Sequence, residues 1–381
     1  MSSVKPISSL LSLLPQEGER VLRICNACRY CEGFCAVFPA LERRFNFSEQ
    51  DVNYLANLCH DCGECYYACQ YAPPHEFALN LPRTLAHLRR ETYQQYAWPS
   101  FLAALFRRTG LALVLSALLV PALFVLLTFL FSGPAVVFSS HSVAAGSFYQ
   151  VVSHEAMTAS FGVVGVFVLI ALGIGFARFW RETGESWSAF LKPSVLAQAL
   201  GDTLRLRYLA GPGEGCAYPD ELPSQARRWF HHLTFYGFLL CFAATTVAAI
   251  YHNVFAWEAP YPLRSVPVVL GSLGGVGLLV GPVGLLWLKR ARNPELSDRG
   301  QTGLDVTFLA LLLGISLTGF LLLALRETAA MGLTLAVHLG LVMGLFLTLP
   351  YGKFVHAVYR FAALARNAIE KQRPSPEQRR E

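Results

Sequence analysis

The chain has 381 residues, of which 54% are hydrophobic and only 15% are charged, and its mean hydropathy is +0.41. This composition is too apolar for a soluble protein of that length and indicates membrane-spanning segments. The formal net charge is +6. Many of the basic residues lie in the connections between apolar segments, so the charge does not indicate nucleic-acid binding.

The first informative element is a cysteine pattern that occurs twice before residue 70. Each run has the spacing Cys-x2-Cys-x2-Cys-x3-Cys, and the runs begin at Cys25 and Cys59. This spacing is typical of proteins that hold two [4Fe–4S] clusters, because three closely spaced cysteines bind one cluster while the fourth binds the other. The predicted ligands are Cys25, Cys28, Cys31 and Cys69 for cluster 1, and Cys59, Cys62, Cys65 and Cys35 for cluster 2.

Other interpretations of the cysteines fit the spacing less well. Zinc sites use two separated Cys-x-x-Cys pairs and leave no role for a third cysteine at the same spacing. A disulfide framework needs an oxidising compartment, and no secretory signal peptide is expected before Cys25. The pattern departs from small bacterial ferredoxins at Ala36 and Gln70, where a proline often follows the fourth cysteine. The remaining cysteines, Cys216 and Cys241, are expected to be lone residues.

Beyond residue 110, long apolar runs predict six transmembrane helices. A helix needs about 20 apolar residues to cross a hydrocarbon core of about 30 Å. The predicted spans are Leu111–Phe131, Ala156–Ala177, Phe230–His252, Val266–Leu288, Leu304–Leu325 and Met331–Tyr351. Pro121 and Pro282 lie inside two of them, which membrane helices tolerate. The dense glycines of the fourth span, from Gly271 to Gly277, are expected to pack closely against another helix.

The distribution of lysine and arginine predicts the orientation of these spans. Basic residues gather in the connections after the second and fourth spans and after Lys353, whereas Ser132–Glu155 contains none. The positive-inside rule therefore places the cysteine domain, these connections and both termini in the cytoplasm. The predicted fold is all-α. It has a helical ferredoxin-like domain at 1–105, a six-helix cytochrome b-like bundle at 106–360 with a cytoplasmic loop at about 178–229, and a basic tail at 361–381.

Histidines in the third and sixth spans indicate haem b sites, since histidine is a haem ligand and helix bundles hold cofactors between facing helices. The third span begins at His231 and His232 and ends at His252, and the sixth contains His338 and is expected to continue to His356. Because 18 residues at 100° each return to one helix face, His338 and His356 are expected on the same face. The predicted ligand pairs are His231 (or alternatively His232) with His356, and His252 with His338.

Each histidine also has a structural interpretation. Four of the five lie where helix ends meet the membrane surface, a position that suits interfacial residues. His338 lies inside an apolar run, where an ionisable group is costly and usually functional. The stretch from His231 to His252 spans about 31 Å of helix, so a single haem is an alternative to two. His154, at the outer end of the second span, is expected to be an interfacial anchor rather than a ligand or a quinone contact.

The sequence offers no dinucleotide-binding motif. Gly173-x-Gly175 is not followed by the third glycine, and it lacks the strand–turn–helix context that binds dinucleotide phosphates. Electrons are therefore expected to come from a partner.

Three stretches resemble the tricarballylate-utilisation protein B family, also called the citrate-utilisation protein B family. They are CHDCGECYYACQYAPPHEFALNLPR (Cys59–Arg83), RRWFHHLTFYGFLLCFAATTVAAIYH (Arg227–His252) and APYPLRSVPVVLGSLGGVGLLVGPVGLLWL (Ala259–Leu288). The resemblance covers most of the chain and implies an iron–sulfur and haem b electron carrier of the bacterial inner (cytoplasmic) membrane. It also implies an FAD-dependent partner dehydrogenase that converts tricarballylate to cis-aconitate, and whose FADH2 is reoxidised for the quinone pool.

The residues and the resemblance together predict a linear electron path, from a cytoplasmic flavoprotein through the clusters and one or two haem b groups to a membrane quinone. Candidate quinone segments on the outer side are His141–His154 and Trp257–Pro262. Two alternatives use the same residues. One is a subunit of a respiratory reductase, in which electrons run from quinol to a soluble partner, and the other is a membrane-anchored redox sensor without turnover. Both the path from flavoprotein to quinone and the respiratory reductase make the chain the electron-transfer component of an oxidoreductase complex.

Overall fold

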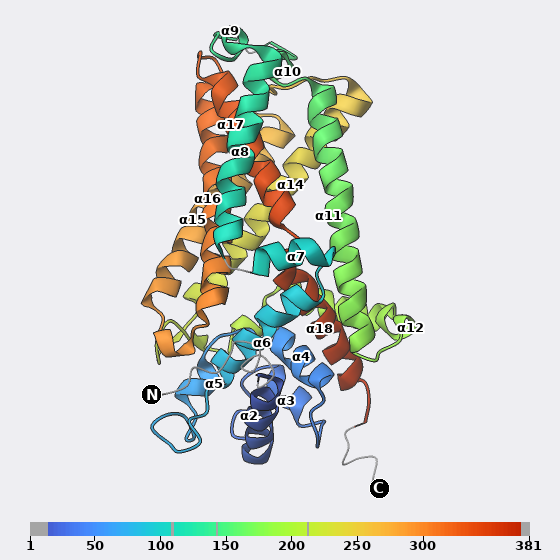
Figure 1. Cartoon of the computed structure of the whole chain (residues 1–381), viewed down its shortest axis with the longest axis vertical. Helices are drawn as coiled ribbons and strands as arrows, with labels where there is room; N and C mark the ends of the chain where they lie inside the picture. Colours follow the sequence, from blue (N-terminus) through green and yellow to red (C-terminus); the bar gives the residue numbers. More distant parts are fainter. Residues whose placement is uncertain (1–13, 108–109, 142–143, 212, 375–381) are drawn as a thin grey trace.

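The computed structural model describes residues 14–107, 110–141, 144–211 and 213–374, and nearly all of them are in helices or short connections (Figure 1). The strands among them are β1 (Cys216–Ala217) and β2 (Pro223–Ser224), which pair as a two-residue antiparallel ribbon. The prediction of an all-α fold is confirmed.

Six helices of the described chain are long and apolar enough to cross a membrane, and they form the elongated bundle in the upper part of Figure 1. They are α8 (Gly110–Ser132), α11 (His154–Glu182), α14 (Ala226–Phe255), α15 (Val266–Ala291), α16 (Arg299–Leu325) and α17 (Met331–Thr348). The short helices α9 (Pro134–Val137) and α10 (Ser147–Val151) lie at the far end of this bundle. The predicted spans are confirmed in number and order, and the chain is a multi-pass membrane protein.

The helices α14 and α15 approach each other along a seam of glycines. A Cβ atom at Gly274 would lie 2.7 Å from the backbone oxygen of Gly237, and one at Gly281 would lie 2.6 Å from the backbone nitrogen of Thr234. Small residues allow membrane helices to pack at this distance. The seam fixes the position of α14, which carries two of the predicted haem ligands. The packing role predicted for these glycines is confirmed.

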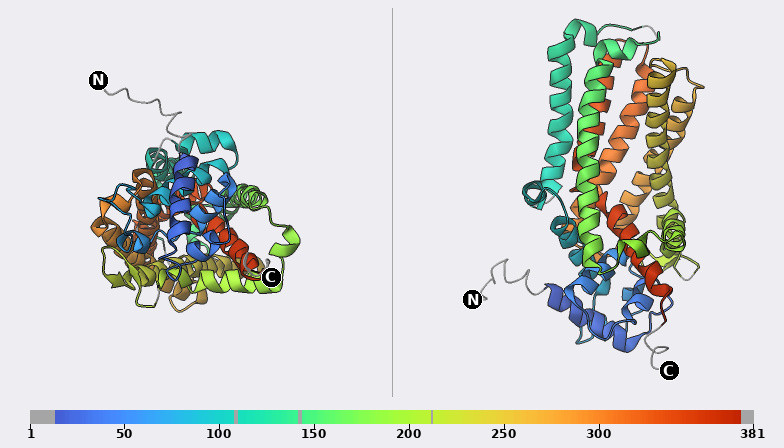
Figure 2. Two further views of the ribbon diagram at one scale, coloured as in Figure 1. Left: turned by 90° about the horizontal axis from the view of Figure 1, so that it is seen from below. Right: turned by 90° about the vertical axis from the view of Figure 1, so that its right-hand side faces the viewer.

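The eight patterned cysteines lie in a separate helical domain at one end of the bundle, seen at the bottom of Figure 1 and again on the right of Figure 2. Its helices are α2 (Leu14–Cys28), α3 (Val37–Leu41), α4 (Glu49–Leu58), α5 (Glu64–Tyr67) and α6 (Leu81–Gln95), and α7 (Ser100–Arg107) leads from it towards α8. Its apolar core is continuous with Phe179 and Trp180 at the lower end of α11 and with Tyr359. The connection from α11 to α14 contains α12 (Trp187–Phe190), α13 (Pro193–Leu204) and the 3-10 turn η1 (Arg207–Leu209).

The helix α18 (Val355–Lys371) differs from what the sequence predicted in two ways. The sixth span does not continue to His356, because α17 ends at Thr348 and the chain turns at Pro350 and Gly352. Proline lacks the backbone N–H that a helix needs and disfavours helical geometry at the residue before it. The basic tail expected from residue 361 is a helix as far as residue 371, and its alanine-rich surface is buried against the cysteine domain. Residues 375–381 lie outside the described chain.

A buried group of charges joins the cysteine domain to the bundle. The carboxylate of Asp61 accepts hydrogen bonds of 2.9 and 3.0 Å from Arg292 and lies 3.7 Å from Arg89. Burial raises the pKa of Asp61, but the charges of Arg292 and Arg89 outweigh it and hold this pKa below its ordinary value. Arg292 lies between α15 and the turn η2 (Pro294–Leu296), so the pair connects the second cysteine run to the base of the bundle.

We predict that Arg292→Leu destabilises the protein by about 3 kcal/mol, because it removes the bidentate partner of a buried carboxylate. The measurement is the midpoint of thermal unfolding of the detergent-solubilised protein. Arg290→Leu is the matched control, since Arg290 is exposed on the same helix. Equal midpoints for both variants and the wild type would show that the Asp61–Arg292 pair contributes nothing to stability.

Candidate functional site

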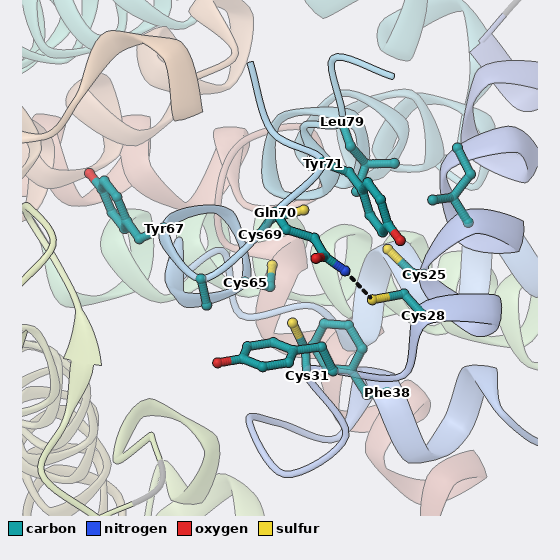
Figure 3. A pocket seen from close by; sticks show the side chains of 13 residues that line it. Cys25, Cys28, Cys31, Phe38, Cys65, Tyr67, Cys69, Gln70, Tyr71 and Leu79 are labelled. Carbon is teal, nitrogen blue, oxygen red and sulfur yellow. Dashed lines mark hydrogen bonds between the residues drawn. The ribbon is translucent and has the colours of Figure 1, made fainter. Parts of the chain in front are cut away.

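The four cysteines predicted to bind cluster 1 line one cavity of about 410 Å³. Figure 3 shows the sulfur atoms of Cys25, Cys28, Cys31 and Cys69 around the same space, with Cys65 beside them. The remaining walls are mainly apolar or aromatic, and they include Ile24, Phe38, Tyr71 and Leu79. The structure therefore brings together three cysteines of the first run and the last cysteine of the second.

The four cysteines predicted to bind cluster 2 line a second, smaller cavity. Cys35, Cys59, Cys62 and Cys65 share it with apolar residues such as Phe34, Leu81 and Leu85. Cys65 lines both cavities, so the two sites are adjacent. The two cavities therefore group Cys69 with the first run and Cys35 with the second, as the predicted ligand sets do.

Backbone turns make this arrangement possible. Arg29 follows the last residue of α2 and has a φ of 55°, and Asp61 has a φ of 55° within the second run. Gly63 has a φ of 90° at the start of α5. These left-handed conformations are uncommon for residues other than glycine and reverse the chain over a single residue. Cysteines that are separated by two residues can therefore point into the same cavity rather than in opposite directions.

The chemistry of the buried thiols suits iron–sulfur binding. Burial, reinforced by Cys69 and Cys28, raises the pKa of Cys31 to about 12, and burial also raises the pKa of Cys35 and Cys65. Iron must therefore displace protons when these cysteines become thiolate ligands. Within the described chain, no three His, Cys, Asp or Glu side chains converge on a site for a single ion. A cubane has a different requirement, because each of its cysteines binds a different iron.

Four buried or half-buried arginines surround the loop that carries Cys59 and Asp61. Arg89 and Arg360 donate hydrogen bonds to the carbonyl oxygen of Cys59 at 2.6 and 2.5 Å. Arg227 donates to the carbonyl oxygens of His60 and Asp61, each at 2.9 Å. The fourth is Arg292, which together with Arg89 pairs with the carboxylate of Asp61. This surplus of positive charge fits a site for an anionic iron–sulfur cluster bound by four thiolates.

Two of these arginines lie one helical turn from the inner pair of predicted haem ligands. Arg227 precedes His231 by four residues on α14, and Arg360 follows His356 by four residues on α18. Residues four apart share one helix face. The same two helices therefore contact the loop of cluster 2 and present a histidine beside it.

The rings of His231 and His356 lie side by side, with centroids 6.2 Å apart and planes at 72°. A ligating imidazole nitrogen lies about 2 Å from its metal, so two rings on opposite sides of one ion have centroids roughly 6 Å apart. Nδ1 of His356 lies 2.6 Å from the carbonyl oxygen of Lys353, which orients the ring and leaves Nε2 for a ligand. Nδ1 of His231 is buried and has no described hydrogen-bond partner beyond its own backbone. The two rings lie at a separation at which both could bind one ion.

The charge state of His356 also suits this role. Burial, then the charges of Lys353 and Arg360, lower the pKa of His356 well below its ordinary value. The ring is therefore neutral at physiological pH, as a metal ligand must be. The alternative ligand, His232, instead packs against Trp229 and Tyr236.

The structure does not bring the predicted outer pair together. The ring of His252 stacks on His154, with centroids 3.5 Å apart and planes at 20°, and Tyr149 contacts both rings. His338 instead lies 3.1 Å from the hydroxyl of Thr318 on α16. Rings stacked at 3.5 Å leave no room for an ion between them. His154 and His252 lie on different helices, α11 and α14, so no local sequence pattern indicates their contact.

One cysteine outside the two runs is buried beside α5. Cys216 in β1 is 3% exposed, its sulfur lies 3.7 and 3.9 Å from the carbonyl oxygens of Leu209 and Tyr208, and the next residue, Ala217, donates a backbone hydrogen bond to the carboxylate of Glu64. No local spacing signals this contact, because 153 positions in the sequence separate Ala217 from Glu64. Cys241 is isolated from the patterned cysteines within α14, and its sulfur lies 3.9 Å from the carbonyl oxygen of Gly271.

Known proteins provide an independent comparison. A family model described as citrate utilization protein B matches residues 104–377, and a second, described as the Fer4-like domain of that protein, matches residues 18–95. A protein of Escherichia coli named citrate utilization protein B is 52% identical over 358 residues, which are 94% of this chain and 93% of the relative. No solved structure matches the chain.

The Fer4-like match covers all eight patterned cysteines, and the other match covers the six membrane-length helices. Together they fit an iron–sulfur electron carrier of the membrane. The family resemblance seen in the sequence is confirmed, and the chain belongs to the citrate utilization protein B family.

Proposed function

We propose that the protein reoxidises the reduced flavin of a cytoplasmic, FAD-dependent partner dehydrogenase and passes the electrons through two [4Fe–4S] clusters and haem b to the quinone pool. The partner's substrate is tricarballylate or a closely related tricarboxylate. The protein acts in the bacterial inner membrane, with the cysteine domain on the cytoplasmic side.

One observation carries this proposal: three potential cofactor positions follow one another from the surface to the bundle. The two cysteine cavities are adjacent through Cys65, and the second cavity is lined by His60, whose carbonyl oxygen accepts a hydrogen bond from Arg227. One turn further along α14, His231 lies beside His356. A series of closely spaced one-electron sites is what a link between a flavin and a membrane quinone requires.

The chain's own residues prepare these positions. Apolar and aromatic side chains line both cysteine cavities and restrict water around them. The arginines at the second cavity supply positive charge close to the position where an added electron would lie. The contact of His356 with Lys353 fixes the ring orientation. When bound, the clusters and the haem supply one-electron redox chemistry that these side chains cannot perform.

The two cavities differ in their access to a soluble partner, which supports entry at cluster 1. Tyr30, which lines the first cavity, is 69% exposed, and nearby Phe77 is 40% exposed and packs on Tyr71. The second cavity is surrounded by Cys59, His60 and other buried residues next to the bundle. A flavoprotein can therefore approach the first cavity more closely than the second.

We predict that anaerobically purified protein shows a b-type α-band in its reduced-minus-oxidised visible spectrum and contains about eight non-haem irons. His356→Ala and His231→Ala each abolish the band that arises from the inner pair, and both retain the non-haem iron, because neither residue lines a cysteine cavity. His338→Ala is the comparison variant and retains this band. Iron without haem in the wild type would contradict the haem part of the proposal, and haem per chain distinguishes one site from two.

We also predict that a short-chain quinone analogue reoxidises the dithionite-reduced protein in liposomes under anaerobic conditions. His356→Ala slows reoxidation of the clusters by at least about tenfold, equivalent to roughly 1.4 kcal/mol of barrier, because the path between the clusters and the bundle is broken. The measurement is the recovery of cluster absorbance after mixing. Failure of the analogue to exchange electrons with the wild type would favour the redox sensor. Cluster reduction by a quinol, without reoxidation by the quinone, would favour the respiratory reductase.

A further inference from the structure

The helix α13 (Pro193–Leu204) runs across the base of the bundle rather than along it. Figure 2 shows it, in light green, along its length in the view from below and end-on in the right-hand view. The short helix α12 (Trp187–Phe190) precedes it and leads away from α11. This direction is that of a helix lying in the plane of a membrane surface, whereas the six long apolar helices are directed across the membrane.

Contacts at both ends place the α12–α13 segment at the level where the membrane helices begin and end. The ring of Trp187 lies 6.0 Å from that of Phe176, two residues before Arg178, where the apolar run of α11 ends. At the other end, the hydroxyl of Tyr236 near the start of α14 donates a hydrogen bond of 2.8 Å to the carbonyl oxygen of Leu204. Tryptophan and tyrosine are typical of the boundary between hydrocarbon and water. The segment therefore lies at the membrane interface.

The helix α13 has two apolar faces with different surroundings. Val195 and Ala199 are buried in the core that α18 shares with the cysteine domain. The side chains of Leu196, Leu200 and Leu204 follow one another at intervals of one helical turn and form a second stripe. One face thus fixes α13 on the protein, and the other is only partly covered by it.

Large apolar side chains of this segment are exposed on the protein surface. Trp187 is 43% exposed, Leu191 is 63% exposed and Leu200 is 50% exposed. Contact with water is unfavourable for such side chains, and the boundary of a bilayer would remove them from it. Their position beside the membrane helices makes the bilayer the surface that covers them.

Positive charge accompanies these apolar side chains. Lys192 and Arg205 stand at the two ends of α13, and both are exposed. The stretch 186–211 contains one acidic residue, Asp202, which is buried and pairs with Arg207 at 3.3 Å. The charges of Lys192 and Arg205 therefore complement a surface that is anionic, such as a bilayer rich in acidic phospholipids.

We propose that α12 and α13 form an interfacial anchor, which lies in the bilayer surface on the side of the cysteine domain and binds anionic phospholipid headgroups through Lys192 and Arg205. The apolar side chains of such a helix enter the boundary of the hydrocarbon, while lysine and arginine reach back to the headgroups. Because α13 also packs on α18, the anchor holds the cysteine domain close to the membrane surface. This inference goes beyond the proposed function and requires no cofactor.

The first test uses Trp187 as a reporter of depth, in liposomes that contain the full-length protein. Phospholipids brominated close to the headgroup quench tryptophans at the interface, and iodide quenches tryptophans that contact water. We expect Trp187→Phe to lower the fraction of the fluorescence that the brominated lipid quenches. A loss only in the fraction that iodide quenches, or no loss in either fraction, would overturn the proposal, because water or a soluble partner would then cover this face.

The second test measures the contribution of the two charges. Phosphatidylglycerol is titrated into the protein in a neutral detergent, and the midpoint of thermal unfolding gives the lipid concentration for half-maximal stabilisation. Lys192→Gln and Arg205→Gln are each expected to raise this concentration about fivefold, because each removes one positive charge at the membrane surface. Arg23→Gln is the matched control and is expected to leave the concentration unchanged, since Arg23 is exposed on α2, away from the bundle (Figure 1).

The midpoints without added lipid show whether each variant is folded. Equal half-maximal concentrations in the wild type and both α13 variants, or an equal rise in Arg23→Gln, would overturn the role of Lys192 and Arg205. Phosphatidylcholine, which has no net charge, is titrated in the same way and is expected to reveal no difference between the variants. A difference of the same size with this lipid would overturn the preference for anionic headgroups.

Discussion

The arrangement of the whole site depends on how four arginines, from α6, α14, α18 and the end of α15, bind the loop from Cys59 to Asp61. The carbonyl oxygens of this loop accept hydrogen bonds from Arg89, Arg227 and Arg360, and its carboxylate pairs with Arg292. Burial, then repulsion from Arg89, lowers the pKa of Arg360 to about 10, so this side chain is still charged at neutral pH. Buried cations must be compensated, and here the compensation comes from the backbone and from the ligands of the second cavity. One set of contacts therefore fixes the distance between the cysteine domain and the histidine helices.

Much of this could be predicted from the sequence, because the relevant signals are local. The spacing of the cysteines predicts two sets of four, and the cysteines of each predicted set line one cavity. The six membrane helices could be predicted from uninterrupted apolar runs, because a helix needs about 20 apolar residues to cross the bilayer. The rings of His231 and His356 lie side by side, as predicted, but the helix geometry assumed for that prediction was wrong. The prediction assumed one continuous helix, whereas α17 ends at Thr348 and a separate helix carries His356.

The features that were missed depend on packing between distant segments. His252, near the end of α14, contacts His154, the first residue of α11, and no periodicity within either helix encodes that contact. Cys216 is buried beside α5 within a hairpin whose position depends on Glu64 and on two arginines. Similarly, residues 361–381 were predicted to be a basic tail because of their charges. The alanines of α18 are buried in the shared core, but alanine is only weakly hydrophobic, so the charges of Arg366 and Lys371 dominated the prediction.

The position of α18 has a consequence for biogenesis. This helix belongs to the core of a domain whose other helices end at Gln95, and it carries His356 of the inner pair. A ribosome makes all six membrane helices after the cysteine domain and before α18, so the domain emerges long before the segment that completes it. The early domain therefore exposes the apolar surface that α18 later covers. A group bound between His231 and His356 could be loaded only after α18 has been made, which is later than all six membrane helices.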